Sequence, residues 1–276
     1  MVLTSFADIG KPGKDLFTKY FKFSLINFDF KSKTEDNVDL HLQCNEVDNK
    51  FVAASDVTFK PVDGISVKTK IDSNWLITND IEIDDKKLSM QHNVITSIDY
   101  AQGAKKLKLK NHLKKERVNA EMELDFASKY PDATASIVFG DKGYVAGAQI
   151  SIGTDGFELK KHVYSLGYCG NEFELHGSLS NNKDFEWRLF QIYKNISVGC
   201  MLGWSGGLLN TKFGVAAMYQ VDKQTFIKGR IDECGRVGFA YGFKPTPETH
   251  MVVAMESSVN RNQPASNCGL TFEISN

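Results

Sequence analysis

The segment AKKLKLKNHLKKERVNAEMELDF, residues 104–126, carries the pattern that decides the fold. Leucines alternate with lysines in its first half, and apolar residues alternate with carboxylates in its second half. Successive side chains of a strand point to opposite faces, so each half predicts a strand with one dry and one wet face. If the strands pair as a hairpin, a basic row faces an acidic row, and such cross-strand pairs contribute about 0.2–1 kcal/mol each. The basic row is Lys106, Lys108 and Lys110, and the acidic row is Glu121, Glu123 and Asp125.

The same alternation runs through most of the chain, from the segment around Phe28 to the segment around Phe272. Predicted strands recur roughly every 10–15 residues over about 250 residues, which is too many for one ordinary sandwich. A closed barrel with a wet interior and a lipid-facing exterior satisfies every backbone group and leaves no free edge. The sequence therefore predicts an all-β membrane protein, a closed transmembrane β-barrel.

Composition excludes several other classes of protein. The 276 residues include 33 basic and 34 acidic side chains, and this balance argues against a nucleic-acid partner. No apolar run reaches the ~18 residues of a membrane helix, and the beginning of the chain lacks a secretory signal. The chain also lacks a nucleophile elbow, a phosphate-binding glycine loop and an acid–base motif, so we expect neither an enzyme nor a cofactor.

The cysteines are five in number and widely scattered, and no CxxC motif occurs. This spacing supports neither a zinc site nor a disulfide framework. We expect free thiols in a reducing compartment and no bound metal.

The only clear helical periodicity lies near the beginning of the chain, in FADIGKPGKDLFTKY at residues 6–20. Apolar or small residues recur close to every 3.6 positions, with lysines beside that stripe. Proline is tolerated in a first helical turn but breaks a helix interior. The segment therefore predicts two short helical pieces with a bend at residues 10–13.

Four segments give the chain a resemblance to the voltage-dependent anion channel family, the porins of the mitochondrial outer membrane. They are FADIGKPGKDLFTK at residues 6–19, FGDKGYVAG at 139–147, NTKFGVAAMYQVD at 210–222 and NCGLTFEI at 267–274. The resemblance implies the family's count of about 19 strands. It also implies an N-terminal helix and linker (residues 1–24) inside the lumen of a barrel formed by residues 25–276. The implied function is a voltage-dependent channel in the lipid bilayer of that membrane, which passes small ions, ATP, ADP and other metabolites. The resemblance also admits a homo-oligomer.

The resemblance assigns roles to particular residues. Lys11, Lys14 and Lys19 would face the water path and bind passing nucleotides, since a flexible ammonium group suits phosphate oxygens. Ile9 would pack on the barrel wall near Val138 and Val145. The family's nicotinamide-nucleotide contacts would correspond to Arg236, Val237, Gly238, Val252, Val253, Ala254, Met255 and Glu256. The closing strand resembles the signal for insertion of mitochondrial barrels, carried here by Asn267, Gly269, Leu270, Phe272 and Ile274.

The chain also departs from the family. The linker at residues 20–24 contains no glycine, although the family has a glycine-rich hinge there. Glycine supplies the free dihedral angles of such a hinge, so we expect reduced or altered voltage-dependent closure. Thr69 replaces a lipid-facing glutamate through which some members are regulated by calcium and kinases, so that regulation should be missing.

The balance of fixed charge in the lumen sets the selectivity that we expect. The expected pore-lining charges are Asp29, Lys68, Lys70, Lys106, Lys108, Lys110, Glu121, Glu123 and Asp125. Their near balance predicts weak anion selectivity or a mild preference for cations. The alternatives are a protein-import barrel of the same membrane, a non-conducting, scaffold-like porin paralogue, and a soluble lipocalin-like carrier.

Overall fold

Strands make up almost all of the computed structural model, which describes residues 4–34, 38–47, 50–127, 130–155, 157–206, 210–259 and 266–275. A 3₁₀ turn, η1 (Phe6–Asp8), and helix α1 (Lys11–Thr18) precede the strands. The strands are β1 (Ile26–Lys33), β2 (Val38–Val47), β3 (Lys50–Val62), β4 (Ile65–Asp72), β5 (Leu76–Asp85), β6 (Met90–Asp99), β7 (Ala104–Lys114), β8 (Val118–Asp125), β9 (Asp132–Asp141), β10 (Tyr144–Gly153), β11 (Glu158–Cys169), β12 (Phe173–Ser180), β13 (Asp184–Tyr193), β14 (Ile196–Ser205), β15 (Asn210–Gln220), β16 (Thr225–Asp232), β17 (Arg236–Thr246), β18 (Thr249–Ser258) and β19 (Ser266–Ser275).

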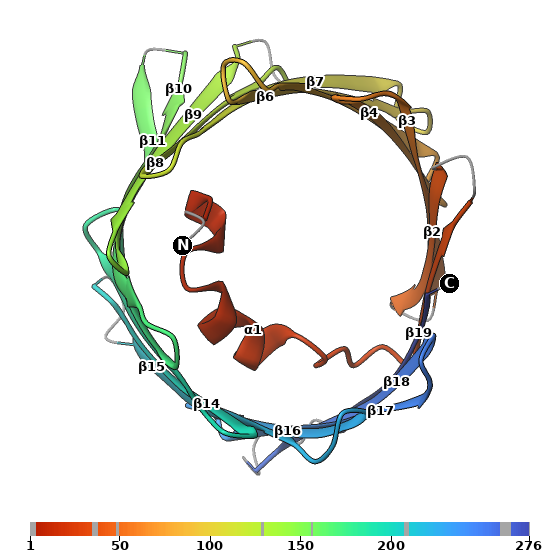
Figure 1. The fold of residues 1–276 in the computed structure, drawn as a ribbon, viewed down its shortest axis with the longest axis vertical. Coiled ribbons are helices and arrows are strands. Elements are labelled where there is room, and N and C mark those ends of the chain that lie inside the picture. The colour runs from red at the N-terminus through yellow and green to blue at the C-terminus, as the bar shows by residue number, and fades with distance from the viewer. Residues whose placement is uncertain are drawn as a thin grey trace. The chain divides into compact units, whose positions relative to one another are not determined.

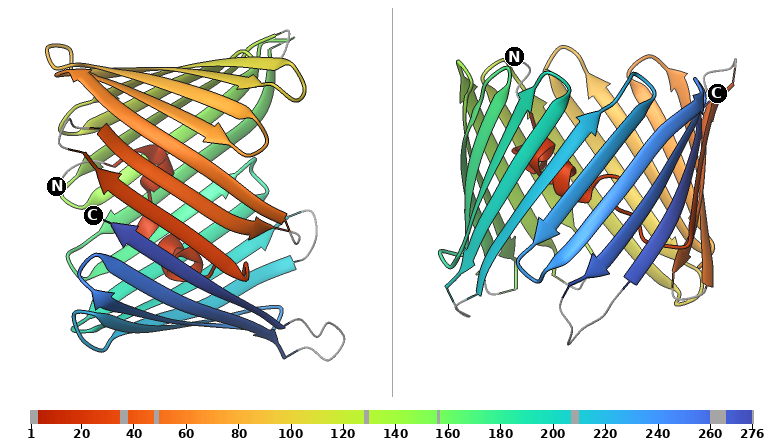
Figure 2. Two further views of the ribbon diagram at one scale, coloured as in Figure 1. Left: turned by 90° about the vertical axis from the view of Figure 1, so that its right-hand side faces the viewer. Right: turned by 90° about the horizontal axis from the view of Figure 1, so that it is seen from below.

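The nineteen strands form one sheet in which each strand is hydrogen bonded to its neighbours in the chain (Figure 1). β1 pairs with both β2 and β19, so the sheet is closed. The predicted fold class, a closed β-barrel of about 19 strands preceded by a short helix, is confirmed. Because the number of strands is odd, the two strands at the closing seam, β1 and β19, run in the same direction (Figure 2).

The chain divides into two compact units. The first consists of Met1–Asp8, Phe30–Gln43 and Val52–Tyr164, and it contains η1 and strands β4 to β10. The second consists of Ile9–Asp29, Cys44–Phe51 and Ser165–Asn276, and it contains α1 and strands β12 to β19.

The hairpin at residues 104–126 forms as the alternation predicts. β7 pairs antiparallel with β8, and Lys108 lies opposite Asp125 while Lys110 lies opposite Glu123. Nζ of Lys108 lies 2.7 Å from Oδ2 of Asp125, and Nζ of Lys110 lies 2.9 Å from Oε2 of Glu123. The predicted pairing of a basic row with an acidic row is confirmed for these two pairs, whereas Glu121 lies opposite His112 and Lys106 has no partner in the described register of β7 with β8.

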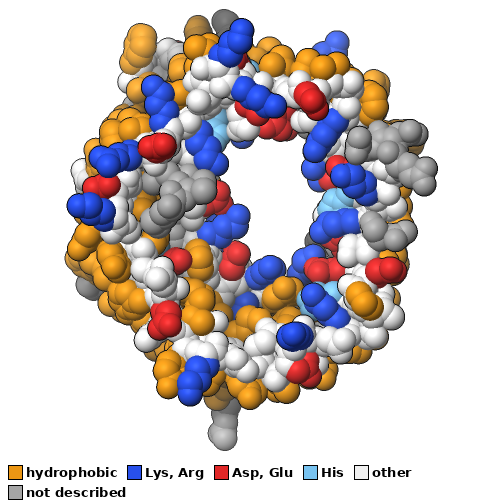
Figure 3. Space-filling view, viewed as in Figure 1, with side chains coloured by type: hydrophobic (Ala, Val, Ile, Leu, Met, Phe, Trp, Pro, Cys, Tyr) orange, Lys and Arg blue, Asp and Glu red, His pale blue; other side chains and the backbone are white. Residues whose placement is uncertain are grey.

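The two faces of each unit differ in chemistry. Large apolar side chains are exposed on the convex face, including Phe59 and Ile81 in the first unit and Phe213 and Phe239 in the second. Figure 3 shows Lys, Arg, Asp and Glu side chains on the concave side of each unit and hydrophobic side chains on its convex side. Soluble proteins rarely expose contiguous apolar patches of this extent, whereas the outer band of a membrane barrel is apolar. The surface is that of a membrane-type barrel.

The beginning of the chain forms two short helical pieces, as predicted, and the bend falls at Gly10, the first residue of the predicted range 10–13, while residues 11–13 belong to α1. Gly10 is in the left-handed conformation (φ 67°) between η1 and α1, and Pro12 lies in the first turn of α1. Proline's fixed φ suits the first turn and its missing N–H is not needed there, so residues 11–13 start the helix instead of breaking it. Among the described residues, no helix is long and apolar enough to cross a membrane.

Candidate functional site

Helix α1 lies against the concave face of its own unit, in contact with β13, β14 and β15 (Figure 2). Leu16 and Gly13 are the buried residues of the helix, and Leu16 has 4% of its surface exposed. It packs over Gly199 of β14, where an added Cβ would lie 2.8 Å from Cδ2 of Leu16. The apolar stripe predicted from the 3.6-residue period therefore faces the wall, and the small wall residue brings the helix close to it.

Two cations from β16 hold the end of α1. Nζ of Lys228, with 2% of the residue exposed, donates hydrogen bonds to the carbonyl oxygens of Asp15 (2.8 Å) and Lys19 (2.7 Å). Arg230 donates one hydrogen bond to the carbonyl oxygen of Phe17 (2.5 Å) and another to Oε1 of Glu256 (2.7 Å). The last carbonyls of a helix lack partners within the helix and carry partial negative charge, so cations stabilise this end. We call Lys228 and Arg230 the helix clamp.

The linker after the helix is also fixed to the wall. Phe21 is buried in a cluster with Phe226, Ala240, Val252 and Ala254. Its ring centroid lies 5.0 Å from Nζ of Lys228 and 4.5 Å from Cζ of Arg230. Cation–π contacts of this kind contribute about 0.5–2 kcal/mol. The clamp therefore grips both the helix end and the glycine-free linker.

The linker then crosses β19 at Gly269. An added Cβ at this position would lie 2.7 Å from the carbonyl oxygen of Ser24 and 2.9 Å from Cα of Phe23, so only glycine leaves room for the chain above it. Beside the crossing, the backbone N–H of Leu270 donates to the carbonyl oxygen of Leu25 (3.1 Å). Gly269 thus has a packing role in addition to the insertion role predicted for it.

A cavity of about 700 Å³ lies beside α1 in the second unit. The charged residues that line it are Lys14, Asp184, Glu186, Arg188, Lys212, Arg230, Asp232, Glu233 and Arg236. Several of them pair with each other: Arg188 lies 2.5 Å from Glu186, and Arg236 lies 2.8 Å from Asp232. Within the described part of the chain, Lys14 and Lys212 form no ion pair. These two ammonium groups are therefore the cations of the cavity that an anion can reach without displacing a carboxylate.

The predicted lysines of the helix occupy different surroundings. Lys14 faces the cavity, Lys11 and Lys19 are exposed, and Nζ of Lys19 lies 5.0 Å from the ring centroid of Tyr20. Of the three lysines, only Lys14 lines this cavity, and their nucleotide role stays a prediction.

The residues predicted to contact a nicotinamide nucleotide fall on both faces of the sheet. Val237 and Met255 are exposed on the convex face, whereas Gly238, Val252 and Ala254 are buried on the concave face. Among the remaining residues, Val253 is half-buried, Glu256 pairs with Arg230 and Arg236 lines the cavity. Phe21 covers Val252 and Ala254. The nucleotide role of this set stays a prediction.

In the first unit, η1 contacts β9 and β10, the strands that carry the buried residues Val138 and Val145. The packing of Ile9 on these valines stays a prediction. Among the predicted pore-lining charges, Lys68 lies 3.3 Å from Asp56, and His112 lies 3.7 Å from Glu121. Asp29 is buried, whereas Lys70 is half-buried and Lys106 is exposed.

In the closing strand, Leu270, Phe272 and Ile274 share one face of β19, as the alternation predicts, and Asn267 is exposed at its start. Their role as an insertion signal stays a prediction.

Sequence reasoning missed the helix clamp. Lys228 and Arg230 lie two residues apart in a strand, so they share one face with Phe226. The alternation indicates two cations on the polar face of this strand. It gives no sign that their hydrogen-bond partners are the distant carbonyl groups of residues 15–19. The role of Lys228 becomes visible only in the folded structure, where helix α1 lies next to its side chain.

The fold and its surfaces define the class of protein: a membrane-type β-barrel with a short helix packed on its concave, charged face. Comparison with known families then identifies the family. The profile of the family described as Eukaryotic porin matches residues 4–269, and the chain belongs to this family. The resemblance seen in the sequence is thereby confirmed.

Individual relatives are similar over most of their length. The voltage-dependent anion-selective channel of Drosophila melanogaster is 28% identical in an alignment that covers 87% of each chain. The human non-selective voltage-gated ion channel VDAC1 is 25% identical in an alignment that covers 98% of each chain. The VDAC2 protein of Sus scrofa is 26% identical over 98% of this chain and 94% of its own. At these identities the chain is a diverged member of the family.

Proposed function

We propose that this chain forms a voltage-gated channel that passes small ions and metabolites, nucleotides included, across the mitochondrial outer membrane. The observation that carries the proposal is that α1 packs on the concave, charged face of a barrel whose convex face is apolar. Relatives that match nearly the whole chain are named voltage-dependent or voltage-gated channels, which supports the same function. A water-filled pore in lipid requires this distribution of charge. In this proposal residues 1–24 form the lumenal helix and linker, and residues 25–276 form the transmembrane barrel.

The cavity beside α1 supports the passage of nucleotides. Its volume of about 700 Å³ falls in the range of small-molecule sites. Lys14 from the helix and Lys212 from β15 both line the cavity, and their ammonium groups bind phosphate as flexible point charges. We infer that a nucleotide pauses here on its way through the pore.

Weak selectivity follows from the pairing of lumenal charge. The cavity presents five cations and four carboxylates, and the lysines of β7 face the carboxylates of β8. Paired charges of opposite sign cancel most of each other's field, so neither ion type gains a strong advantage. We infer weak anion selectivity or a mild preference for cations.

We infer that this protein is not regulated through a lipid-facing carboxylate at position 69. Oγ1 of Thr69 donates a hydrogen bond to Oδ1 of Asn79 (3.0 Å) on the neighbouring strand. This neutral pair places no ionised group in the hydrocarbon, where ionised groups are costly and functional.

The proposal is tested by recording current through the purified, refolded protein in a planar bilayer with a tenfold salt gradient. We expect stable conductance steps, a voltage dependence and a reversal potential close to zero. A strong chloride preference would contradict the selectivity, and silence from a protein that is folded and inserted would favour a non-conducting paralogue. Passage of peptides in preference to nucleotides would favour a protein-import barrel.

A further inference from the structure

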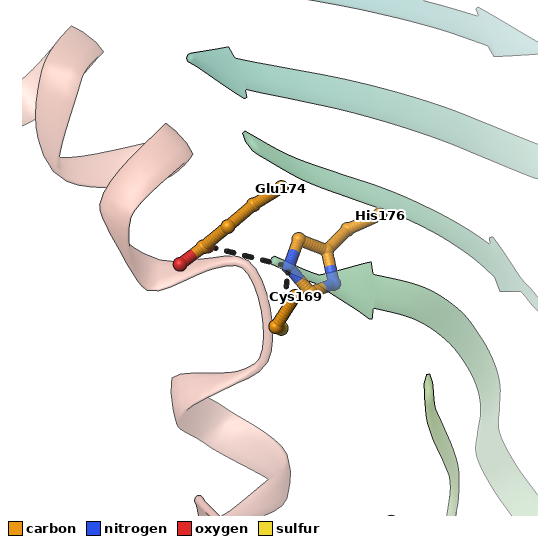
Figure 4. Close-up of side chains that lie close together, drawn as sticks. All are labelled: Cys169, Glu174 and His176. Carbon is orange, nitrogen blue, oxygen red and sulfur yellow. Dashed lines mark hydrogen bonds and ion pairs between the residues drawn. The ribbon is translucent and has the colours of Figure 1, made fainter. Parts of the chain in front are cut away.

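Three potential metal ligands meet at the turn between β11 and β12. Cys169 is the last residue of β11, and Glu174 and His176 share one face of β12. The turn is tight, because the backbone N–H of Gly170 donates to the carbonyl oxygen of Phe173 (2.7 Å). This turn brings the thiol over the two β12 side chains, and Figure 4 shows the three side chains converging beside the helical segment.

The distances between the ligand atoms match a tetrahedral ion. Sγ of Cys169 lies 3.6 Å from Nε2 of His176, which lies 3.5 Å from Oε2 of Glu174, and all three ligand atoms lie within 4.8 Å of one another. Tetrahedral zinc has Zn–S bonds of about 2.3 Å and Zn–N and Zn–O bonds of about 2.0–2.2 Å. At tetrahedral angles these bonds place sulfur and nitrogen about 3.5 Å apart, and nitrogen and oxygen about 3.4 Å apart. Two of the three edges therefore already have the required length.

The side chain of His176 is held in the orientation that the site needs. It is 7% exposed and lies between the backbones of Gly10 and Gly167. An added Cβ would lie 2.7 Å from its Cε1 at Gly167, where only glycine leaves room for the ring, and 3.1 Å from its Cγ at Gly10, where the positive φ also favours glycine. Nε2 points at the thiol and the carboxylate, and Nδ1 has no hydrogen-bond partner among the described residues. With a metal on Nε2, the ring proton stays on Nδ1.

The ligand types select the metal. Thiolate and imidazole suit zinc and related transition ions, whereas calcium and magnesium prefer oxygen ligands. Three protein ligands leave a fourth position for water. From this geometry we propose that Cys169, Glu174 and His176 bind one Zn²⁺ ion, directly beneath the bend between η1 and α1. Binding replaces the S–H bond of Cys169 with a Zn–S bond and releases the thiol proton to water.

The scattered cysteines predicted no metal, because none of them forms a CxxC motif. Here a cysteine precedes the turn of a hairpin and an E-x-H pair follows it, so the ligands meet across the turn and not along one segment. The inference does not depend on conduction, since the site is formed by the wall alone.

The experiment uses the full, refolded chain in detergent micelles, stripped with a chelator and titrated with Co²⁺ and then with Zn²⁺. We expect one Co²⁺ per chain with a thiolate-to-metal absorption band, and displacement of that band by Zn²⁺. Cys169→Ser should abolish the band and weaken Zn²⁺ binding at least 100-fold, and Glu174→Gln should weaken it at least 10-fold. Cys44→Ser, a change at another half-buried thiol, should leave the band unchanged. Circular dichroism of each variant checks that the barrel has formed.

Two results would assign no metal to this thiol, and a third would remove the carboxylate from the site. One is a wild-type protein that shows no thiolate band at any Co²⁺ concentration below the onset of precipitation. The other is a band that survives Cys169→Ser but disappears in Cys44→Ser, which would assign the metal to a different thiol. Undiminished affinity in Glu174→Gln would remove the carboxylate and with it the site as proposed.

Discussion

Replacement of Lys228 by methionine tests whether the helix clamp holds α1 on the wall. Methionine keeps a flexible apolar stem but removes both hydrogen bonds to the carbonyl oxygens of Asp15 and Lys19. Hydrogen bonds that involve a charged group contribute about 1.5–3 kcal/mol each. We take the lower value for both, because the ammonium group of Lys228 is deeply buried and regains hydration when the helix detaches. The variant should therefore lose about 3 kcal/mol of helix docking.

A loss of about 3 kcal/mol raises the detached fraction of the helix about 100-fold. Hydrogen exchange measures this fraction directly, because amides of α1 exchange through the detached state. We expect exchange at residues 14–18 to be about 100-fold faster in Lys228→Met than in the wild type, with the strands unchanged. In the bilayer, the same variant should close at lower voltage.

Lys212→Met is the matched control. Lys212 lines the same cavity but donates no hydrogen bond to α1 in the described structure. Its exchange pattern should equal that of the wild type. Equal exchange in Lys228→Met and the wild type would refute the clamp, since it would show that the two hydrogen bonds contribute nothing to docking.

Three further changes address the linker, the crossing and the cavity. The double replacement Phe21→Gly and Ser24→Gly should restore steep voltage-dependent closure. The reason is that loss of the buried ring removes about 3–5 kcal/mol of the free energy that anchors the linker. An unchanged voltage response would contradict this prediction. Gly269→Ala should lower the free energy of unfolding in urea by about 1–3 kcal/mol through overpacking, whereas Gly229→Ala, where the nearest atom lies 3.9 Å from the added Cβ, should be neutral. Lys14→Gln should shift the reversal potential in the direction of greater cation preference and should not reduce the rate at which any ion passes. A shift in the direction of greater anion preference would contradict the cavity as an anion site.

Period-2 patterning was sufficient to predict a barrel of many strands, because burial on one face of a strand leaves a direct mark in the sequence. The count of about 19 strands came from the family resemblance and not from the pattern. The hairpin of β7 and β8 is the clearest instance, since its charged rows specify the partner as well as the strand. The bend was predicted over all of residues 10–13, although only Gly10 forms it, because the pattern shows proline and glycine but not which residue adopts a positive φ.

The clamp and the Cys169 cluster depend on contacts between distant segments, which no local period encodes. Lys228 lies more than 200 positions from the carbonyls that it binds. Local sequence analysis has no signal for such a pair, and the same holds for the crossing of residues 22–24 over Gly269.

The seam between β1 and β19 sets the order in which the protein assembles. Asn27 reaches the carbonyl oxygen of Leu270 across 243 positions of chain. Closing a flexible loop of that length costs about 5 kcal/mol of entropy. The cost nearly vanishes once the intervening hairpins have formed in sequence and hold the two ends together. We therefore expect the seam to be the last pairing to form. A bulky residue at 269 would thus disturb the strand that completes the barrel as well as strain the linker that packs on it.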